Sequence, residues 1–480
     1  MDGSDGMLSR RSTRFLILNV LLLSSWCVSG TSGGGCEVFP FEDTPSINVN
    51  TKILKCNNVT IASVNRDFFN DNKVIYKEII LNEIESGPDE YLNVINEHQT
   101  EILKLIDSRV TDEQLQKIFH NKNFARLRIL DVSGNKIQRL QRDTFRKCVR
   151  LRVLSLARNQ ISEIQTDAFA DLWDLSELYL NNNNLTRGVE VFTGLRQLTI
   201  LDMSNNSITN IERHMFISLE SLVNINLSYN KLYILPYQVF ESLRSIEVID
   251  LSHNLLVSFL DNFFIHNRNL KILQLHNNLI GKINKNSLYG LKELHTLDLS
   301  HNQLLTVDRN AFDTLDGLQF LKLGHNQIQL LSANVFLSLK QLRSLDLSFN
   351  DLQILPLGIF AHQFLLEELK MDNTRLIKLS NWISKTNMNS TIDKTVLRNL
   401  KTVSLRNSLS LRDIESCFLQ NMPGLEKLFI THSQVTFLPN GIGEMPLLVD
   451  LDLSDNRLQF IPQGIKHLTE LKSLNLLSND

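Results

Sequence analysis

The 480-residue sequence has little of what marks several classes of protein. Nine prolines and nineteen glycines are too few for a collagen-like or linker-rich chain, and five cysteines are too few for a disulfide-built scaffold of this length. The 49 basic residues nearly balance the 52 acidic ones, which argues against a dedicated nucleic-acid-binding protein. Beyond the N-terminus, no apolar run approaches the ~18 residues that mark a transmembrane helix. Hydrophobic residues still make up 42% of the chain, so it can bury a substantial core.

The N-terminus carries the pattern of a secretory signal peptide over residues 1–30. Arg10, Arg11 and Arg14 form a positive region, an apolar stretch follows over residues 15–23, and small residues at 28–30 offer a cleavage site. The apolar stretch is about half as long as a helix that crosses a bilayer, and a signal anchor is the alternative. We therefore expect a protein of the secretory pathway, either extracellular or at the cell surface.

An internal repeat governs most of the chain. The pattern L-x-x-L-x-L-x-x-N-x-L first occurs cleanly at residues 127–137 and returns in steps of 24 residues, once 23, as far as Asn350. A row of phenylalanines, once replaced by leucine, follows the asparagines by ten residues, once nine. The asparagine position is occupied by Asn135, Asn159, Asn183, Asn206, Asn230, Asn254, Asn278, Asn302, Asn326, Asn350, Thr374, Ser408, Ser433, Asn456 and Asn479.

These two rows resemble the extracellular leucine-rich repeat family in its 24-residue form, closely over residues 127–480 and loosely over 73–110. The resemblance implies an α/β-type solenoid, a curved horseshoe with a parallel β-sheet on its concave side and irregular or short helical segments on its convex side. Each coil offers a period-2 strand such as Leu297-Asp298-Leu299, and one coil cannot bury its own leucines without stacking on its neighbours. The asparagine amides are expected to satisfy buried backbone groups in the turns.

The regularity of the repeat predicts the organisation of the chain. We expect an N-terminal cap segment at 31–72, degenerate repeats at 73–126, regular repeats at 127–376, an insertion loop at 377–399 and C-terminal repeats at 400–480. The last coil lacks a C-terminal cap, so we expect the sequence to be a truncated part of a longer protein.

The cysteines are expected to be structural. Cys36 and Cys56 bracket a short segment after the signal peptide, and an oxidising compartment would let them form a disulfide. Cys148 falls where neighbouring repeats place a buried leucine, and Cys417 lies beside Phe418. We interpret both as small buried residues rather than reactive thiols.

No catalytic, cofactor-binding or metal-binding motif is recognisable, so we expect a non-catalytic protein without a cofactor. Asp250-Leu251-Ser252-His253 offers the side chains of a hydrolase, but it follows the repeat's own pattern and lacks an oxyanion donor. His253, His301 and His325 directly precede ladder asparagines, so stacked coils should hold them in a loose column. We interpret this column as a solvated row, with a pH-sensitive binding stripe as the alternative and a metal site as the least favoured one.

The outward strand positions and the turns after them are the expected binding surface. A wide, rigid stripe that carries aromatic anchors suits a protein partner better than a small molecule, although any solvated face needs polar residues. The candidate contacts are Tyr179, Asp202, Tyr229, Asp250, His253, Asp298, His301, Lys322, His325, Asp346, Phe349 and Lys370.

The sequence contains five N-x-S/T sequons, at which a secreted protein can carry surface glycans. They are at Asn58, Asn184, Asn205, Asn226 and Asn389. Asn226 occupies an outward strand position. A glycan there would obstruct the concave face, unless the modifying enzyme does not reach it.

The chain is also loosely similar to Toll-like receptor ectodomains and to secreted leucine-rich immune proteins of insects. That similarity implies an extracellular recognition protein that binds a protein or pathogen-derived ligand, in innate immunity or as a cell-surface receptor. The insect proteins' cysteine-rich region and coiled coil, and a Toll-type signalling domain, are absent here. Adhesion or guidance, a structural matrix role and a secreted enzyme inhibitor are the alternatives. The expected partner is a protein ligand or co-receptor, with homodimers and heterodimers both open, no nucleic acid, and membrane contact only through a missing C-terminal segment.

Overall fold

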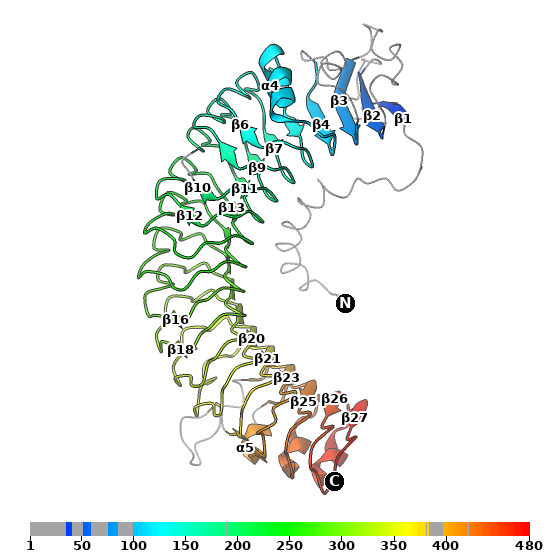
Figure 1. The fold of residues 1–480 in the computed structure, drawn as a ribbon. Coiled ribbons are helices and arrows are strands. Elements are labelled where there is room, and N and C mark those ends of the chain that lie inside the picture. The colour runs from blue at the N-terminus through cyan, green and yellow to red at the C-terminus, as the bar shows by residue number, and fades with distance from the viewer. Residues whose placement is uncertain are drawn as a thin grey trace.

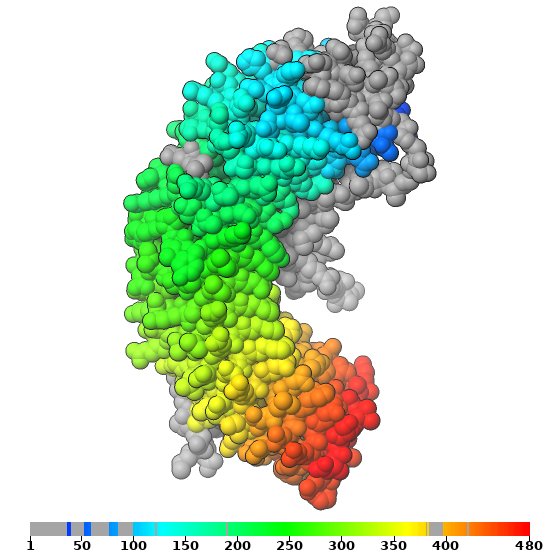
Figure 2. Space-filling model, in the orientation of Figure 1, coloured from blue at the N-terminus to red at the C-terminus, as the bar shows by residue number. Residues whose placement is uncertain are grey.

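The computed structural model describes residues 35–40, 51–58, 75–84, 99–188, 191–380, 382–383, 397–419 and 422–480. The predicted signal peptide, the sequon at Asn389 and most of the predicted insertion loop lie outside the described residues. The chain forms a curved solenoid whose parallel strands line the concave side (Figure 1). Figure 2 shows the coils following one another along the same arc. The predicted horseshoe is confirmed.

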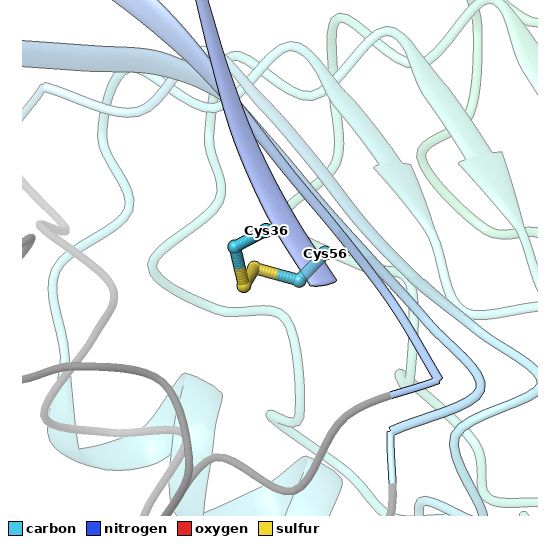
Figure 3. The surroundings of a disulfide bond; sticks show 2 residues. All are labelled: Cys36 and Cys56. Carbon is cyan, nitrogen blue, oxygen red and sulfur yellow. A yellow bond between two sulfur atoms is a disulfide. The ribbon is translucent and has the colours of Figure 1, made fainter. Parts of the chain in front are cut away.

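The first strands differ from the rest in length and direction. β1 (Gly35–Pro40) pairs antiparallel with β2 (Thr51–Asn57), and β2 continues in parallel to β3 (Ile75–Asn82) and β4 (Ile102–Ile106). Cys36 and Cys56 lie directly opposite each other on β1 and β2 and form a disulfide, as the sequence predicted (Figure 3). A helix, α4 (Asp112–Asn121), follows β4, and Thr111 caps its N-terminus.

From β4 onward each coil adds one short strand in unbroken register. These strands are β5 (Ile129–Asp131), β7 (Val153–Ser155), β9 (Glu177–Tyr179), β11 (Ile200–Asp202), β13 (Asn224–Asn226), β14 (Val248–Asp250), β15 (Ile272–Gln274), β17 (Thr296–Asp298), β19 (Phe320–Lys322), β20 (Ser344–Asp346), β21 (Glu368–Lys370), β23 (Thr402–Ser404), β25 (Lys427–Phe429), β26 (Asp450–Asp452) and β27 (Ser473–Asn475).

A second set of two-residue strands pairs neighbouring coils on the segment that leaves the concave side. They are β6 (Arg139–Leu140), β8 (Glu163–Ile164), β10 (Arg187–Gly188), β12 (Asn210–Ile211), β16 (Lys282–Ile283), β18 (Thr306–Val307), β22 (Lys378–Leu379) and β24 (Asp413–Ile414). The return segments are mostly turns. Near the C-terminal end they contain α5 (Ser416–Leu419), η2 (Asn440–Glu444) and η3 (Gln463–His467).

The phenylalanine row packs as a column inside the convex side and accounts for the curvature. Phe145, Phe169 and Phe192 are buried, and consecutive rings stack with centroids 6.3 Å apart. Strands of a sheet lie only ~4.8 Å apart. Because the coils are spaced more widely at the phenylalanine row than at the sheet, the stack bends with the strands inside.

Each ladder asparagine joins its own turn to the preceding coil. Asn302 Nδ2 donates to the carbonyl oxygens of Leu299, at 3.1 Å, and of Leu275 in the preceding coil, at 2.9 Å. Asn302 Oδ1 accepts the backbone N–H of Ile280 at 3.0 Å. This confirms that the asparagines satisfy buried backbone groups, as the sequence predicted.

The two free cysteines among the described residues differ from each other. Cys148 is buried, as predicted, and burial raises the pKa of its thiol to about 12. Cys417 is only partly buried, so the prediction of a buried residue is wrong for it. Its thiol donates to Glu415 Oε2 at 3.3 Å, and burial together with that carboxylate raises its pKa to about 11.

Candidate binding surface

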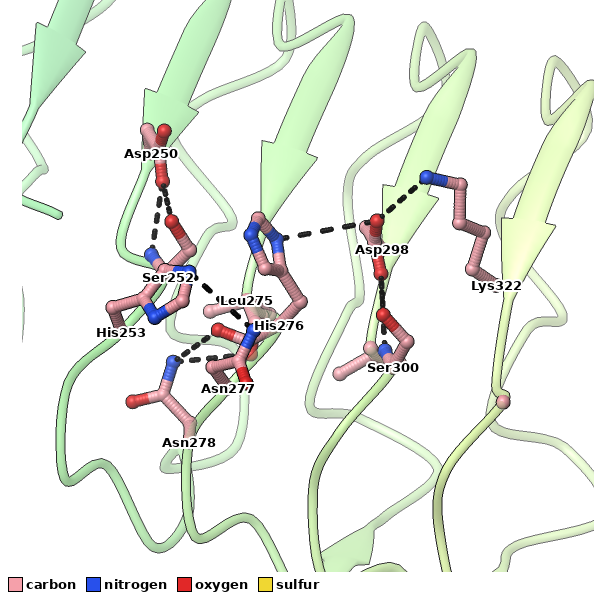
Figure 4. Close-up of polar contacts among 12 residues, drawn as sticks. Asp250, Ser252, His253, Leu275, His276, Asn277, Asn278, Asp298, Ser300 and Lys322 are labelled. Atoms are coloured by element: carbon pink, nitrogen blue, oxygen red, sulfur yellow. Dashed lines mark hydrogen bonds and ion pairs between the residues drawn. The ribbon is translucent and has the colours of Figure 1, made fainter. Parts of the chain in front are cut away.

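The aspartates on the concave strands cap the turns that follow them. Asp250 Oδ1 accepts both the backbone N–H of Ser252, at 2.9 Å, and its hydroxyl, at 2.6 Å (Figure 4). Asp298 and Ser300 repeat this arrangement at 3.0 and 2.6 Å. The serine hydroxyl therefore donates to a carboxylate within its own coil. The Asp-Leu-Ser pattern stabilises its own turn, and in the part of the chain that the structure describes both serine hydroxyls donate to aspartate rather than to a histidine.

Three of the predicted contacts, Tyr179, Asp202 and Asp298, are not exposed. Tyr179 is only 5% exposed, and its hydroxyl donates to Glu177 Oε2 at 2.8 Å. Burial, reinforced by Glu177, raises the pKa of Tyr179. Asp202 is buried beside it, and burial raises its pKa although Ser204 donates to it. The prediction that Tyr179 is an exposed anchor is wrong, because the ring lies along the sheet against its own strand.

Asp298 is the electrostatic centre of the concave face. Its Oδ2 lies 2.9 Å from Lys322 Nζ and 3.9 Å from His276 Nδ1, both on neighbouring coils (Figure 4). Burial alone would raise the pKa of Asp298, but the Ser300 hydroxyl and the Lys322 ammonium outweigh it, and the pKa is lowered. His276 Nδ1 is buried and accepts or donates no hydrogen bond within the described part of the chain. The Asp298 carboxylate is therefore paired with Lys322, and it lies beside a buried imidazole nitrogen of His276 that makes no hydrogen bond among the described residues.

Charges alternate along the next strands. Asp298 and Lys322 form an ion pair, Asp346 binds the N–H of Ser348 at 2.9 Å, and Lys370 Nζ lies 2.8 Å from Glu368 Oε1. This part of the face presents cations that are about half exposed beside carboxylates committed to turns or ion pairs. It has both signs of charge rather than the uniformly acidic stripe that the aspartates alone suggest.

The first residues of the concave strands share a face with these charges, and the sequence analysis did not consider them. They are apolar and half-buried at Ile129, Val153, Ile200, Val248, Ile272 and Phe320, and polar at Glu177, Asn224, Thr296, Ser344 and Glu368. Side chains two positions apart on a strand share a face, so the same alternation that located Asp298 also locates Thr296. Counting a single outward position per strand omitted these residues.

The side chains of the turn residues form a stacked array at one edge of the concave face. We call it the ring ladder, and its members are Tyr229, His253, Asn277, His301, His325 and Phe349. The rings of Tyr229 and His253 stack with centroids 3.9 Å apart. The His301–His325 and His325–Phe349 pairs do the same at 3.9 Å. Asn277 Nδ2 lies 3.4 Å from His253 Nε2 and occupies the place between the two ring stacks. The histidines predicted to form a loose column are therefore closely packed with the neighbouring rings, at centroid distances of 3.9 Å.

The backbone explains which residue types occupy the ring ladder. All six residues have φ between 53° and 55°, in the left-handed region that Asn, Asp and His tolerate best. Tyr229 and Phe349, at 53° and 55°, are bulky residues that rarely adopt this conformation. They are nevertheless 54% and 44% exposed. Burial and His276 lower the pKa of His253, and burial and His301 lower that of His325.

The sequons differ in accessibility. Asn58, Asn184 and Asn205 are exposed, whereas Asn226 is half-buried and its Oδ1 accepts the N–H of Ser228 at 3.0 Å. Within the described ranges, no three His, Cys, Asp or Glu side chains are grouped to hold a metal ion. None of the helices in those ranges has the length and apolar character needed to cross a bilayer.

A family model described as leucine rich repeat matches residues 125–185, 188–232, 244–304, 268–328, 292–352 and 398–458, together more than half of the chain. No curated protein matches the sequence.

Several solved structures share the fold. The Toll chain of the Drosophila Toll–Spatzle complex is similar over 89% of this chain and 58% of its own length, at 21% identity and a TM-score of 0.71. A leucine-rich repeat protein of Leptospira interrogans is similar over 83% of this chain and 90% of its own, at 23% identity and a TM-score of 0.60. The functional domain of InlJ from Listeria monocytogenes is similar over 79% and 68%, at 20% identity and a TM-score of 0.53.

Proposed function

Because this chain belongs to the leucine-rich repeat family, we propose that it is a non-catalytic extracellular recognition protein that binds a protein ligand at the concave face and its ring ladder. The binding region runs from Tyr229 to Lys370. Expression outside the cell rests on the N-terminal signal pattern and agrees with the disulfide between Cys36 and Cys56.

The ring ladder is the observation that carries the proposal. Two exposed aromatic residues, Tyr229 and Phe349, occupy a backbone conformation that costs such residues roughly 1–2 kcal/mol each. Of the nine equivalent positions in the other coils, four hold Asn, which tolerates this conformation, and the other five hold Gly134, Arg158, His432, Asp455 and Ser478. Exposed aromatic side chains give a folded monomer little stability, but they dominate the energy of protein interfaces. Retaining them in strained turns therefore favours contact with a partner.

The chemistry of the face supports binding rather than catalysis. The Asp and Ser side chains bond each other inside turns, and Asp298 is held by Lys322. Half-exposed cations, capped carboxylates and half-buried apolar residues such as Phe320 and Ile272 on the same sheet together resemble the mixed polar and apolar character of protein interfaces.

The structural neighbour Toll suggests the class of partner. That receptor was solved in complex with Spatzle, in work described as concerning development and innate immunity. By analogy we propose that this chain acts as a receptor or soluble recognition protein in innate immunity, with a folded protein as ligand. The chain spans 58% of the Toll chain, so this analogy extends only to the repeat array.

The test is a comparison of matched variants in ligand capture. The secreted chain would be immobilised, exposed to extracellular fluid taken before and after microbial challenge, and its bound proteins identified by mass spectrometry. We expect one protein to bind the wild type, and binding to weaken at least about tenfold when Tyr229 and Phe349 are both replaced by Asn, a loss of about 1.4 kcal/mol. Asn suits the left-handed turns, so the fold should persist.

Tyr289→Asn is the control, because Tyr289 is also about half exposed but lies beside Leu288 in the phenylalanine row of the return segment. It should bind like the wild type. Equal affinity of the double variant and the wild type would refute the site. A ligand found equally in unchallenged fluid, or a cell-surface adhesion protein or protease as ligand, would instead favour adhesion or inhibition over immunity.

A further inference from the structure

The basic residues of this chain are concentrated in one stretch, directly after α4 (Figure 1). Residues 122–158 contain 11 lysines and arginines and only two acidic residues, whereas the whole chain carries a formal charge of −3. The tripeptide Arg-Leu-Arg occurs twice in this stretch, at 126–128 and at 150–152, one repeat period apart. The stretch is therefore a strongly basic part of an otherwise acidic chain.

The two tripeptides occupy the same place in neighbouring coils, just before β5 and β7. The leucine of each tripeptide is fully buried, and the arginines on both sides of it are exposed. The backbone N–H of Arg152 donates to the carbonyl oxygen of Arg128 at 2.8 Å, so these two residues are direct neighbours across the coils. Four exposed arginines therefore form a two-by-two array. We call it the arginine quartet, and its members are Arg126, Arg128, Arg150 and Arg152.

Little negative charge offsets the arginine quartet. Arg128 Nη1 lies 3.4 Å from Glu101 Oε2, but the other oxygen of that carboxylate lies 3.4 Å from Lys77 Nζ. The other three members of the quartet form no ion pair among the described residues. Cations held this close repel one another, and an anion bound between them would remove that repulsion.

The arginine quartet lies on the edge of the sheet opposite the ring ladder. The concave strands from β4 onward are parallel, so residues that precede them lie along one edge and residues that follow them lie along the other. The sequons at Asn58, Asn184 and Asn205 follow their strands, and Asn226 lies within one. Glycans at these sequons would therefore leave the quartet accessible.

We propose that the arginine quartet binds a sulfated polysaccharide of the cell surface or extracellular matrix. The planar guanidinium group donates two parallel hydrogen bonds to an oxyanion, and this geometry suits a sulfate group. Neighbouring coils are ~4.8 Å apart and residues two positions apart on one chain are roughly 7 Å apart, so the quartet can engage several sulfate groups of a short sugar segment. Such binding would hold the secreted chain at a surface while its concave face stays open. It does not depend on the proposed ligand site.

The surroundings of the quartet favour a polysaccharide over a nucleic acid. Among the residues described between 99 and 197, Trp173 is the only exposed Phe, Tyr or Trp side chain, and it lies in the turn that follows in the next coil. One ring can pack against one sugar, whereas proteins that bind single-stranded nucleic acids stack successive bases on several rings. Binding to a duplex draws on many phosphate contacts, and four arginines on an otherwise acidic chain supply few of them.

The test is binding of the full secreted chain to a heparin oligosaccharide, measured by surface plasmon resonance at about 0.15 M salt. We expect the wild type to bind, and Arg150→Gln/Arg152→Gln to bind at least about tenfold more weakly. The matched control is Arg139→Gln/Arg142→Gln, which removes the same charge from the segment that leaves the concave face, where each arginine pairs with a carboxylate. The control should bind like the wild type. All four side chains are exposed, so both variants should unfold at the same temperature as the wild type.

A wild type that does not bind heparin would overturn the proposal, and so would equal weakening in the two double variants, which would indicate a response to net charge alone. Equal binding of the unsulfated polysaccharide with the same backbone would also overturn it. Tighter binding of single-stranded DNA, or of vesicles that contain phosphatidylserine, through Arg150 and Arg152 would replace it with a nucleic-acid or membrane site. Tyr229→Asn/Phe349→Asn should bind heparin normally, so this inference and the proposed function can fail separately.

Discussion

The imidazole rings of His301 and His325 stack across neighbouring coils, with centroids 3.9 Å apart and planes 12° from parallel. Two protonated rings at this separation would repel each other, because like charges this close disfavour ionisation. Burial and then His301 lower the pKa of His325, and burial and then His276 lower that of His253. At neutral pH the His253 and His325 rings of the ring ladder are therefore predominantly uncharged.

Acidification should destabilise the ring ladder. The unfolded-state pKa of histidine is about 6.5, and the folded values of His253 and His325 lie below it. Between the folded-state pKa and the unfolded-state pKa, the unfolded chain binds more protons than the folded chain. The free energy of unfolding that these histidines contribute is therefore fully present above pH ~6.5 and declines as the pH falls from there toward the lowered folded-state pKa. We expect His253→Gln/His325→Gln to lose less stability than the wild type between about pH 7 and pH 5.

Urea unfolding at several pH values would check this expectation. Asp298 faces the same region, and its pKa is lowered from a value that already lies below this range, so its titration does not mask the effect. Parallel loss of stability in the wild type and the double variant would show that these two histidines do not carry the pH dependence.

Replacing Asp202 or Asp298, which occupy equivalent strand positions, by asparagine should change the stability of the fold in opposite directions. Burial raises the pKa of Asp202, so its ionised form costs stability at pH ~7, whereas Ser300 and Lys322 lower the pKa of Asp298, so its ionised form stabilises the fold. Asp202→Asn should be neutral or stabilising by up to about 1 kcal/mol, and Asp298→Asn should cost about 1 kcal/mol.

Asn226 shows that an amide oxygen can accept the turn N–H in this position. Both variants create an N-x-S sequon, so they must be produced in a host that does not glycosylate asparagine. Thermal unfolding at neutral pH is the measurement. A loss of stability of the same size in both would mean that the turn hydrogen bonds, rather than the charge environment, decide the outcome.

The ladder asparagines should be far more sensitive than the turn residues beside them. Asn302→Ala removes one donor from the carbonyl oxygens of Leu275, Leu299 and Ser300 and leaves the buried N–H of Ile280 without its acceptor. The Leu275 and Leu299 carbonyls keep the amide of a neighbouring ladder asparagine, so we expect a loss of about 1–3 kcal/mol in urea unfolding, mainly from the unsatisfied N–H. Asn277→Gly in the adjoining coil is the control, because glycine accepts the positive φ of this turn, and it should lose less than about 1 kcal/mol. Similar losses at both positions would contradict the structural role of the ladder.

Position 229 should separate backbone strain from ring stacking. Tyr229→Asn relieves about 1 kcal/mol of left-handed strain and loses a stacking contact with His253 worth about 0.5–1.5 kcal/mol, so stability should change little. Tyr229→Val loses the same contact and places a β-branched residue at positive φ, which should make it about 1–2 kcal/mol less stable than Tyr229→Asn. Equal stability of the two variants would argue against strain at this turn.

The repeat in the sequence was sufficient to predict the curved sheet, the inward leucines and the role of Asn302 and its equivalents. These features follow from spacing, because a fixed period puts the same residue type at the same place in each coil. The disulfide between Cys36 and Cys56 was predicted separately, from their position after the signal pattern and from the oxidising compartment that this pattern implies. The helix α4 was missed, although Thr111 and Gln114 form the capping box that its sequence spells out.

What the tertiary structure alone decided is which outward residues are available to a partner. Tyr179 is the outward residue of a concave strand, and Tyr229 lies in the turn after one, so the sequence places both on the expected binding surface. In the structure Tyr179 bonds to Glu177 and is buried, whereas Tyr229 stacks on His253 and stays exposed. Exposure and ring stacking are set by contacts between side chains in neighbouring coils, about 24 residues apart. The period of the sequence brings those coils together, but side-chain packing between them determines the surface that they present.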